Sequence, residues 1–211
     1  RGKDFGIMLK ALTSEGYIVQ WRAITSSEYG YSQRRKRVYI LCSKQESNAM
    51  YKYLPISEKV DKRTFNLKDG YESGYEFLNS GECRGNVVKT WKSVATNENG
   101  LVLGDVIVDE SEVSEKYYYT KEQVERMNYL RGAKKIPRES HGITYIYSEG
   151  AMSEVDSLEK PSRTMTTTEG NVSRTSHVVE VNGRRRKLLP KECERLNGFP
   201  DDWTAMSSDR K

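Results

Sequence analysis

The stretch Gln33–Arg37 constrains this chain most, because it runs directly into the apolar residues Val38–Leu41. In an extended backbone alternate residues share a face, so Gln33, Arg35 and Arg37 project to one side. Two guanidinium groups on one side are costly unless something anionic or polar lies there. The stretch therefore predicts either a solvated basic edge or a polar site at the mouth of a buried strand.

A helix and two strands are predicted around this stretch. Apolar residues at i, i+3, i+4 and i+7 predict a helix over residues 4–15, and alternation predicts a strand over 17–25. Residues 26–32 form a polar turn. The apolar run 37–42 does not alternate, which predicts a buried strand. The two strands lie close in sequence, which favours the antiparallel edge of a larger α/β sheet.

The pattern becomes irregular further along, with many Tyr, Gly, Ser, Asn and Glu residues. The elements predicted there are a strand over 101–108, a helix opened by the capping box Thr120 and Gln123, a strand over 143–147, a hairpin around Asn182-Gly183, and a short helix over 190–197.

Composition excludes several classes of protein. The chain has 211 residues and a net charge of +5, which is compatible with a nucleic-acid partner but does not demand one. Cys42, Cys83 and Cys193 are too widely spaced for a disulfide framework or a zinc site, and the first and last lie in apolar patterns typical of small core residues. His141 and His177 lack metal-ligand spacing and are expected on the surface or in loops. No membrane span or signal peptide is visible, so a reduced, cytoplasmic setting is the expectation.

Three downstream segments are candidates for function. Glu159–Asn171 is rich in hydroxyls and contains Gly and Arg; such loops can lie against phosphates, although an ordinary strand and turn is the alternative. Arg184–Lys187 is a dense basic run, which predicts a solvated face or the lining of a DNA cleft. Leu189–Trp203 contains the short helix, on which Glu192 and Arg195 are spaced to pair.

In this order and at this separation, the Gln33–Arg37 element and the Leu189–Trp203 phrase resemble the C5-cytosine DNA methyltransferases. The resemblance implies that Arg37 donates to O2 of an extruded cytosine, that Arg35 holds a phosphate or orients the catalytic glutamate, and that Gln33 fixes the nearby loop. Polarising O2 withdraws electron density from the ring and eases attack at C6, once the base has left the duplex.

The same resemblance places DNA contacts in the hydroxyl-rich segment. Thr164-Met165 falls where the family carries a Thr-Leu-type dipeptide, and the residues after it correspond to a recognition loop. The tyrosines of Val113–Thr120 also resemble a phrase of the recognition domain, where they are expected to pack in a strand. The implied DNA-binding residues are Arg163, Thr164, Met165, Thr166, Thr167, Gly170, Asn171 and Arg174.

The expected fold class is α+β. It combines the end of an α/β methyltransferase sheet (helix-strand-strand) with an irregular, mostly β target recognition domain and a short helix. The expected domains are the C-terminal part of the catalytic domain over 1–44, the target recognition domain over 45–175, and a segment returning to the catalytic domain over 176–211.

The sequence lacks other motifs of that family, namely the Gly-rich loop for S-adenosylmethionine, a Pro-Cys nucleophile and the Glu-Asn-Val element. It is therefore interpreted as part of a bacterial or phage enzyme whose partners are double-stranded DNA and the remaining N-terminal catalytic part. S-adenosylmethionine is expected in the full-length enzyme and not on this piece. Two alternatives stay open: a separate DNA-binding specificity subunit of a split or inactive methyltransferase, and a basic α+β domain with no DNA role.

Overall fold

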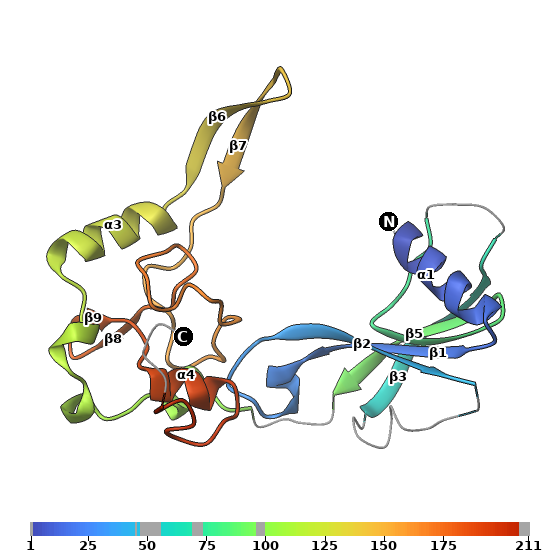
Figure 1. Cartoon of the computed structure of the whole chain (residues 1–211), viewed down its shortest axis with the longest axis horizontal. Helices are drawn as coiled ribbons and strands as arrows, with labels where there is room; N and C mark the ends of the chain where they lie inside the picture. Colours follow the sequence, from blue (N-terminus) through green and yellow to red (C-terminus); the bar gives the residue numbers. More distant parts are fainter. Residues whose placement is uncertain (1, 45, 47–55, 69–73, 96–99, 207–211) are drawn as a thin grey trace. The chain divides into compact units, whose positions relative to one another are not determined.

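The computed structural model describes residues 2–44, 46, 56–68, 74–95 and 100–206 (Figure 1). The chain divides into two compact units. Unit 1 contains residues 1–30 and 35–100, and unit 2 contains residues 31–34 and 101–211. The chain therefore passes between the units three times, after Gly30, after Arg34 and after Gly100.

Unit 1 is an antiparallel sheet with one helix. Its strands lie in the order β2-β1-β4-β5-β3, and every neighbouring pair is antiparallel. The elements are α1 (Lys3–Ser14), β1 (Ile18–Thr25), the 3-10 helix η1 (Ser26–Tyr29), β2 (Lys36–Ser43), β3 (Ile56–Asn66), β4 (Ser80–Arg84) and β5 (Val87–Ala95). The predicted first helix and first strand are confirmed to within one residue at each end.

The core of unit 1 is apolar and aromatic. Leu9 from α1 packs with Val19 and Trp21 from β1 and with Val88 from β5. Gly81 in β4 makes room for the Trp21 ring, because a Cβ at this glycine would lie 2.2 Å from a ring carbon. The periodic apolar residues of the first helix thus face the sheet as the sequence pattern predicts.

Strand β2 corrects one prediction. The run 37–42 is a strand and pairs antiparallel with β1, as predicted, but it is not buried. Val38 is 57% exposed and Tyr39 is 51% exposed. The physical reason is its place in the sheet, where β2 is an edge strand. The continuous apolar run correctly indicated a strand, but it did not indicate whether other elements cover that strand.

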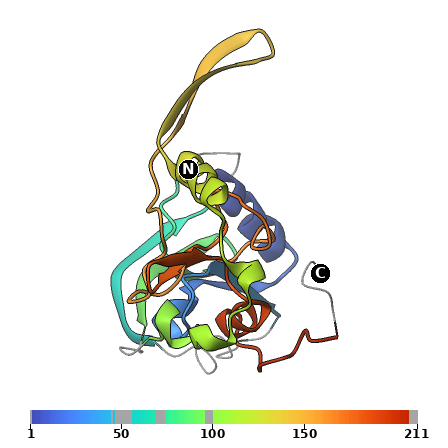
Figure 2. The ribbon, with the colours of Figure 1, turned by 90° about the vertical axis from the view of Figure 1, so that its left-hand side faces the viewer.

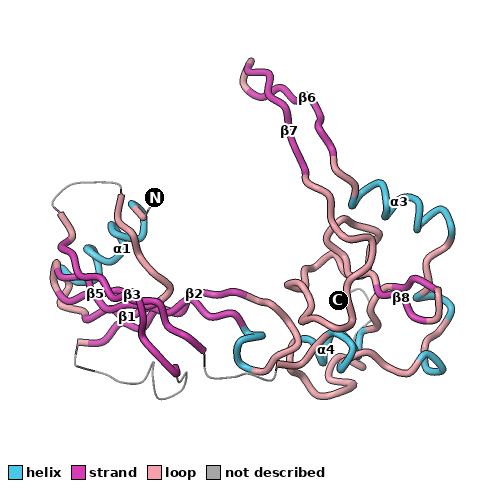
Figure 3. Tube along the Cα trace, turned by 180° about the vertical axis from the view of Figure 1, so that it is seen from behind, coloured by secondary structure: helices cyan, strands magenta, loops and turns pink. Residues whose placement is uncertain are grey.

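Unit 2 has little regular structure (Figure 3). Two hairpins and two α-helices are joined by loops and short 3-10 turns. The elements are η2 (Leu103–Asp105), η3 (Glu110–Glu112), η4 (Glu115–Tyr117), α3 (Lys121–Arg131), β6 (Lys134–Ser140), β7 (Ile143–Glu149), β8 (Val179–Val181), β9 (Arg184–Arg186) and α4 (Pro190–Leu196). Strands β6 and β7 form a ribbon that projects from the rest of this unit (Figures 1 and 2).

Four predicted elements of unit 2 are confirmed, and one of them is the short helix over 190–197, which is α4. Thr120 and Gln123 form the capping box of α3, with the Gln123 N–H donating to the Thr120 hydroxyl over 3.3 Å. The strand over 143–147 is β7. Asn182 and Gly183, at φ 51° and 75°, turn the β8–β9 hairpin. Left-handed conformations at both turn positions are what a type I′ turn requires.

Two other predictions for unit 2 are wrong. The segment 101–108 contains no strand but includes the 3-10 turn η2, and its apolar residues Leu103 and Val106 fill a small core with Val179 and Leu196. The Tyr117 segment is likewise a 3-10 turn and not a strand. Both segments are buried by tertiary contacts, which a strand-like apolar pattern does not distinguish from sheet formation.

The fold class is thus a mixed α+β architecture with antiparallel sheets, and its described part contains three α-helices. No helix among the described residues has the length and apolarity needed to cross a bilayer. In the same part of the chain, no group of three or more His, Cys, Asp and Glu side chains is arranged to hold a metal ion. Burial raises the pKa of Cys83 to about 11 and that of Cys193 to about 12, so both thiols are protonated at neutral pH.

Candidate functional site

Gln33 is a buried residue of unit 2, and its side chain makes internal hydrogen bonds. Its side chain is 2% exposed. The amide Nε2 donates to the carbonyl of Leu196 over 3.1 Å, and the Met165 N–H donates to its Oε1 over 3.2 Å. A parallel β-bridge also joins Gln33 to Ser162. One side chain therefore ties the end of α4 to the start of the hydroxyl-rich loop.

Arg35 and Arg37 lie beyond Gln33, in unit 1. The Ser26 N–H donates to the Arg35 carbonyl over 3.0 Å, which fixes the backbone before β2. Arg35 is half-buried, whereas Arg37 is exposed and donates to the Lys36 carbonyl over 2.7 Å. The three residues of the predicted site thus differ, because one is buried and the arginines remain accessible to solvent.

The hydroxyl-rich loop begins at Thr164 and Met165. The Thr164 hydroxyl donates to the Arg34 carbonyl over 3.0 Å, and the Arg34 N–H donates to the Ser162 carbonyl over 2.8 Å. The Asn197 amide lies 3.7 Å from the Met165 sulfur. Within unit 2, the sequence-predicted residues Gln33, Thr164 and Met165 therefore lie together, although about 130 positions separate them along the chain.

The tip of this loop faces solvent. Thr166, Thr167, Gly170 and Asn171 are all exposed. The Asn171 N–H donates to the Thr168 carbonyl over 2.9 Å, which closes a turn. Nothing lies within 4 Å of a Cβ built on Gly170, so another molecule can approach its backbone closely. These four residues form the accessible part of the predicted DNA-contacting set.

Hydrogen bonds between Glu169 and His177 hold the base of this loop. The His177 N–H donates to Glu169 Oε2 over 2.7 Å, and His177 Nδ1 lies 3.0 Å from Oε1. Burial alone would raise the pKa of Glu169, but hydrogen bonds and charge from His177 lower it below its usual value. His141 is exposed, and His177 lies in a loop, so both fit the expectation of a surface or loop position, although the His177 side chain is completely buried. The sequence around a single histidine in a polar segment does not predict that it is buried against a glutamate.

Arg163 belongs to a buried ion cluster beside this contact. Its Nε lies 2.6 Å from Asp156 Oδ1, and Arg131 Nη2 lies 3.0 Å from Oδ2 of the same carboxylate. The Val178 N–H also donates to Asp156 over 2.9 Å. Burial would raise the pKa of Asp156, but hydrogen bonds from Arg163 and Val178 and the charges of both arginines lower it to about 2. Arg163 therefore holds unit 2 together, and its contact with DNA stays a prediction.

Arg174 clasps the base of the β6–β7 ribbon. Its guanidinium donates to the carbonyls of Leu130 and Gly132, which precede β6, over 2.6 and 3.3 Å. It also donates to the carbonyl of Gly150, which follows β7, and lies 3.6 Å from the Glu149 carboxylate. Sequence reasoning assigned this residue to DNA, and that contact stays a prediction beside the internal role that the structure shows.

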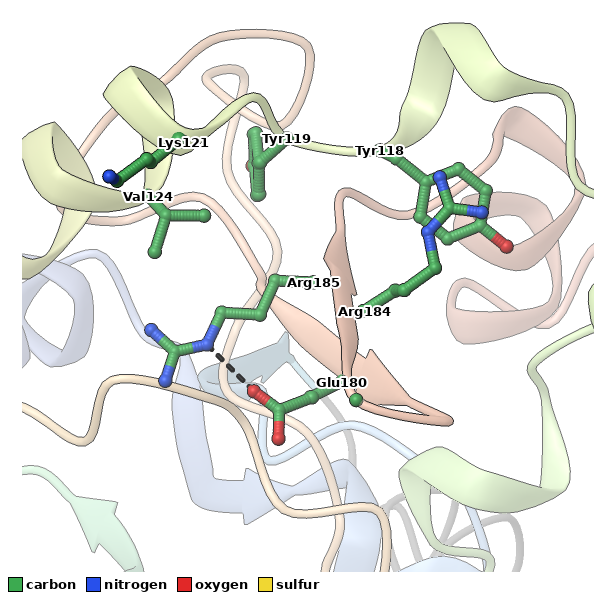
Figure 4. A pocket seen from close by; sticks show the side chains of 8 residues that line it. Tyr118, Tyr119, Lys121, Val124, Glu180, Arg184 and Arg185 are labelled. Atoms are coloured by element: carbon green, nitrogen blue, oxygen red, sulfur yellow. Dashed lines mark hydrogen bonds and ion pairs between the residues drawn. The ribbon is translucent and has the colours of Figure 1, made fainter.

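The basic run Arg184–Lys187 is largely neutralised by carboxylates. Arg184 stacks on Tyr118 at 3.6 Å and pairs with Glu115 over 2.7 Å. Arg185 pairs with Glu180 over 2.7 Å at a shallow pocket, where Figure 4 shows the two side chains pointing toward each other. The pocket is lined by Tyr118, Tyr119, Lys121, Val124, Glu180, Gly183, Arg184 and Arg185. Arg184 keeps 52% of its side chain exposed, whereas Arg186 is fully buried, so only part of the run is a solvated face, and the lining of a DNA cleft stays a prediction.

The predicted pairing of Glu192 with Arg195 on the last helix is wrong, because Glu192 binds Arg186. Arg186 is fully buried and binds the fully buried Glu192 over 2.8 Å and Glu110 over 2.9 Å. Glu192 also accepts the Leu189 N–H over 2.8 Å at the start of α4. Arg195 pairs with Asp201 over 2.7 Å and not with Glu192. Helical spacing made the Glu192–Arg195 pair plausible, but the buried guanidinium of Arg186 competes for the carboxylate.

Taken together, the chain places an exposed arginine at the start of an edge strand in unit 1 and a pinned, hydroxyl-rich loop in unit 2. The sequence model of the C-5 cytosine-specific DNA methylases matches residues 1–211, so the chain belongs to that family. It is also similar to the type II methyltransferase M.Sau3AI of Staphylococcus aureus, at 37% identity over 233 aligned residues. That alignment covers 97% of this chain and 56% of the relative, so the chain spans a little over half of the relative's length.

Proposed function

We propose that this chain is part of a DNA (cytosine-5-)-methyltransferase and that it supplies DNA recognition together with the arginines that hold the target cytosine. The family match along the whole chain carries the proposal. The accessible arginines of the Gln33–Arg37 element and the exposed tip of the hydroxyl-rich loop support it.

Arg37 is the proposed contact to the cytosine. A guanidinium donates hydrogen bonds and keeps its charge at any physiological pH. Donation to O2 of a flipped cytosine draws electron density from the ring, so that C6 becomes more open to a nucleophile. The exposure of Arg37 fits this role. Arg35 is proposed to hold a phosphate or to orient the acid that protonates the ring.

Gln33 is proposed to act as a positioning residue. Its amide is occupied by Leu196 and Met165, which supports an effect through the loop and not through the cytosine. The exposed residues Thr166, Thr167, Gly170 and Asn171 are proposed to contact the DNA backbone, since hydroxyls and open backbone N–H groups suit phosphate oxygens.

S-adenosylmethionine is the proposed methyl donor for the intact enzyme. It supplies an electrophilic methyl group to C5 of the cytosine. No residue of this chain is proposed to hold the cofactor or to attack C6, and the chain is proposed to depend on the N-terminal catalytic part for both. The proposed domains remain 1–44, 45–175 and 176–211. Gln45, at the first border, lies outside the described residues.

A type II restriction-modification setting in the cytoplasm is proposed from the relative M.Sau3AI. The family membership and the free state of Cys42, Cys83 and Cys193 are compatible with that setting. The alternative of a separate DNA-binding specificity subunit predicts that DNA is methylated only when a second polypeptide is present.

The test is to map 5-methylcytosine in the DNA of cells that express the intact protein. Wild type is expected to methylate cytosine in one short sequence. The activity of Arg37→Ala is expected to be at least about 100-fold lower, because removing one hydrogen-bond donor to the transition state typically costs that much in rate. Arg126→Ala is the matched control, because Arg126 is exposed on α3 and carries the same charge. Equal activity of the two variants would contradict the role of Arg37, and no methylation by wild type would contradict the proposed function.

A further inference from the structure

The β6–β7 ribbon is the largest feature of unit 2 that the proposed function does not use. Its strands pair from Lys134–Glu149 to Ser140–Ile143, and His141 and Gly142 make the turn. Every residue from Lys135 to Ile146 is exposed. A lone two-stranded hairpin is at best marginally stable in water, and exposed apolar side chains often mark an interaction surface.

The base of this ribbon is held firmly. Arg174 bonds to carbonyls on both sides of it, at Gly132 and Gly150. The Lys134 ammonium donates to the Leu130 carbonyl over 2.9 Å and lies 3.6 Å from Glu149. The ribbon is therefore clamped where it joins unit 2 and bare along the rest of its length. A rigid base with free faces suits insertion into a partner.

The two faces of the ribbon differ in chemistry. Directly opposed residues share a face, so the register puts Arg138 and Tyr145 with Ile136 and Tyr147 on one side. The Arg138 guanidinium carbon lies 3.9 Å from the centre of the Tyr147 ring. Within the described residues, this guanidinium makes no hydrogen bond or ion pair, so its donors are open while the ring of Tyr147 lies against it.

The opposite face carries Pro137, Glu139 and Ile146. Proline has no N–H to donate to a further strand, and in sheets it is confined to edges. Pro137 therefore argues against a partner that adds a strand at the free edge of β6. The charge of the first face favours an anionic partner, because its carboxylate Glu149 is already bound by Lys134 and Arg174.

We propose that the β6–β7 ribbon enters the major groove of duplex DNA with its Arg138–Tyr145 face toward the base edges. The major groove is about 12 Å wide and admits a two-stranded β-ribbon. A guanidinium that lies against an aromatic ring and has open donors is suited to bidentate bonding to guanine O6 and N7. This inference rests on the proposed function for its partner and adds the element that reads sequence.

The first test measures the affinity of the intact protein for two duplex oligonucleotides, one with the sequence found by methylation mapping and one with that sequence scrambled. Arg138→Ala is expected to raise Kd for the first duplex by about 10- to 100-fold and to change Kd for the second much less. Arg126→Ala and Lys135→Ala, which remove a charge outside the proposed face, are expected to change both less than about 3-fold. Equal losses on both duplexes, or no difference from the controls, would overturn the inference.

The second test identifies what the ribbon touches. A photo-crosslinking amino acid placed at Tyr145 is expected to form a covalent adduct with the first duplex. Crosslinks only to the polypeptide itself, or to a second copy, would show a protein-covered ribbon and overturn the proposal. The two ideas fail separately: wild type that does not methylate DNA contradicts the proposed function, whereas active wild type whose ribbon variants behave as the controls contradicts this inference alone.

Discussion

The two units bury different kinds of side chain. Unit 1 is filled with rings, and Phe5 packs edge-on against Trp21 and Phe77 at centroid distances of 5.2 and 4.8 Å. Its buried arginine, Arg22, bonds to the neutral hydroxyl of Tyr29. Unit 2 instead buries oppositely charged pairs. Apolar packing has no charge to titrate or to screen, whereas buried ion pairs are costly to break from one side.

This difference has a topological reason. The sheet of unit 1 offers a continuous apolar face for α1, so ring packing suffices. Unit 2 has short strands and long loops, so many backbone carbonyls need partners other than a sheet. Arg131, Arg163 and Arg174 all donate to such carbonyls as well as to carboxylates. Arginine, with five donors, suits this task.

The largest expected effect is in unit 2. Arg186→Met leaves the fully buried Glu192 without its cation and is expected to lower the unfolding free energy by about 3–5 kcal/mol. Urea denaturation would measure it. Arg184→Met is the matched control, two residues away in the same strand, because its pair with Glu115 is exposed and worth about 1 kcal/mol or less. Similar losses for both variants would contradict the contrast between buried and exposed pairs.

The next effect belongs to unit 1. Leu9→Ala removes a fully buried side chain from the core and is expected to cost about 2–5 kcal/mol, from lost burial and the cavity left behind. The loss should be nearly the same at low and moderate concentrations of NaCl, because no charge is removed. Ala11→Gly, at a helix position that is exposed, serves as control and should cost about 1 kcal/mol. A loss for Leu9→Ala that varies with salt would contradict an apolar origin.

The smallest effect is a dependence on pH. The pKa of Asp156 is about 2 in the folded chain against an ordinary value of 3.8. Its folded pKa is depressed, so its contribution is complete above about pH 4 and is lost as pH falls toward 2. The contribution is about 2 kcal/mol. The difference in unfolding free energy between wild type and Asp156→Asn should decrease over this pH range in acid denaturation. A constant difference between pH 5 and pH 2 would contradict the depressed pKa.

Local patterns predicted much of the fold. The first helix and strand, the capping box at Thr120 and the Asn182-Gly183 turn are set by neighbouring residues, so the sequence alone suffices. The strand predicted over 101–108 failed, because apolar residues there meet a distant cluster and not a neighbouring strand. The exposure of β2 likewise depends on its place in the sheet order.

The candidate site divides in the same way. The Gln33–Arg37 element and the Leu189–Trp203 phrase identified the family from sequence, since each motif is contiguous and their order is distinctive. The tertiary structure alone decided which charged groups are internal. The sequence predicted DNA contacts for Arg163 and Arg174 and a surface or loop position for His177, yet all three side chains have internal partners 7 to 44 positions away along the chain. Which partner captures a buried charge depends on distance in space, and no local spacing records it.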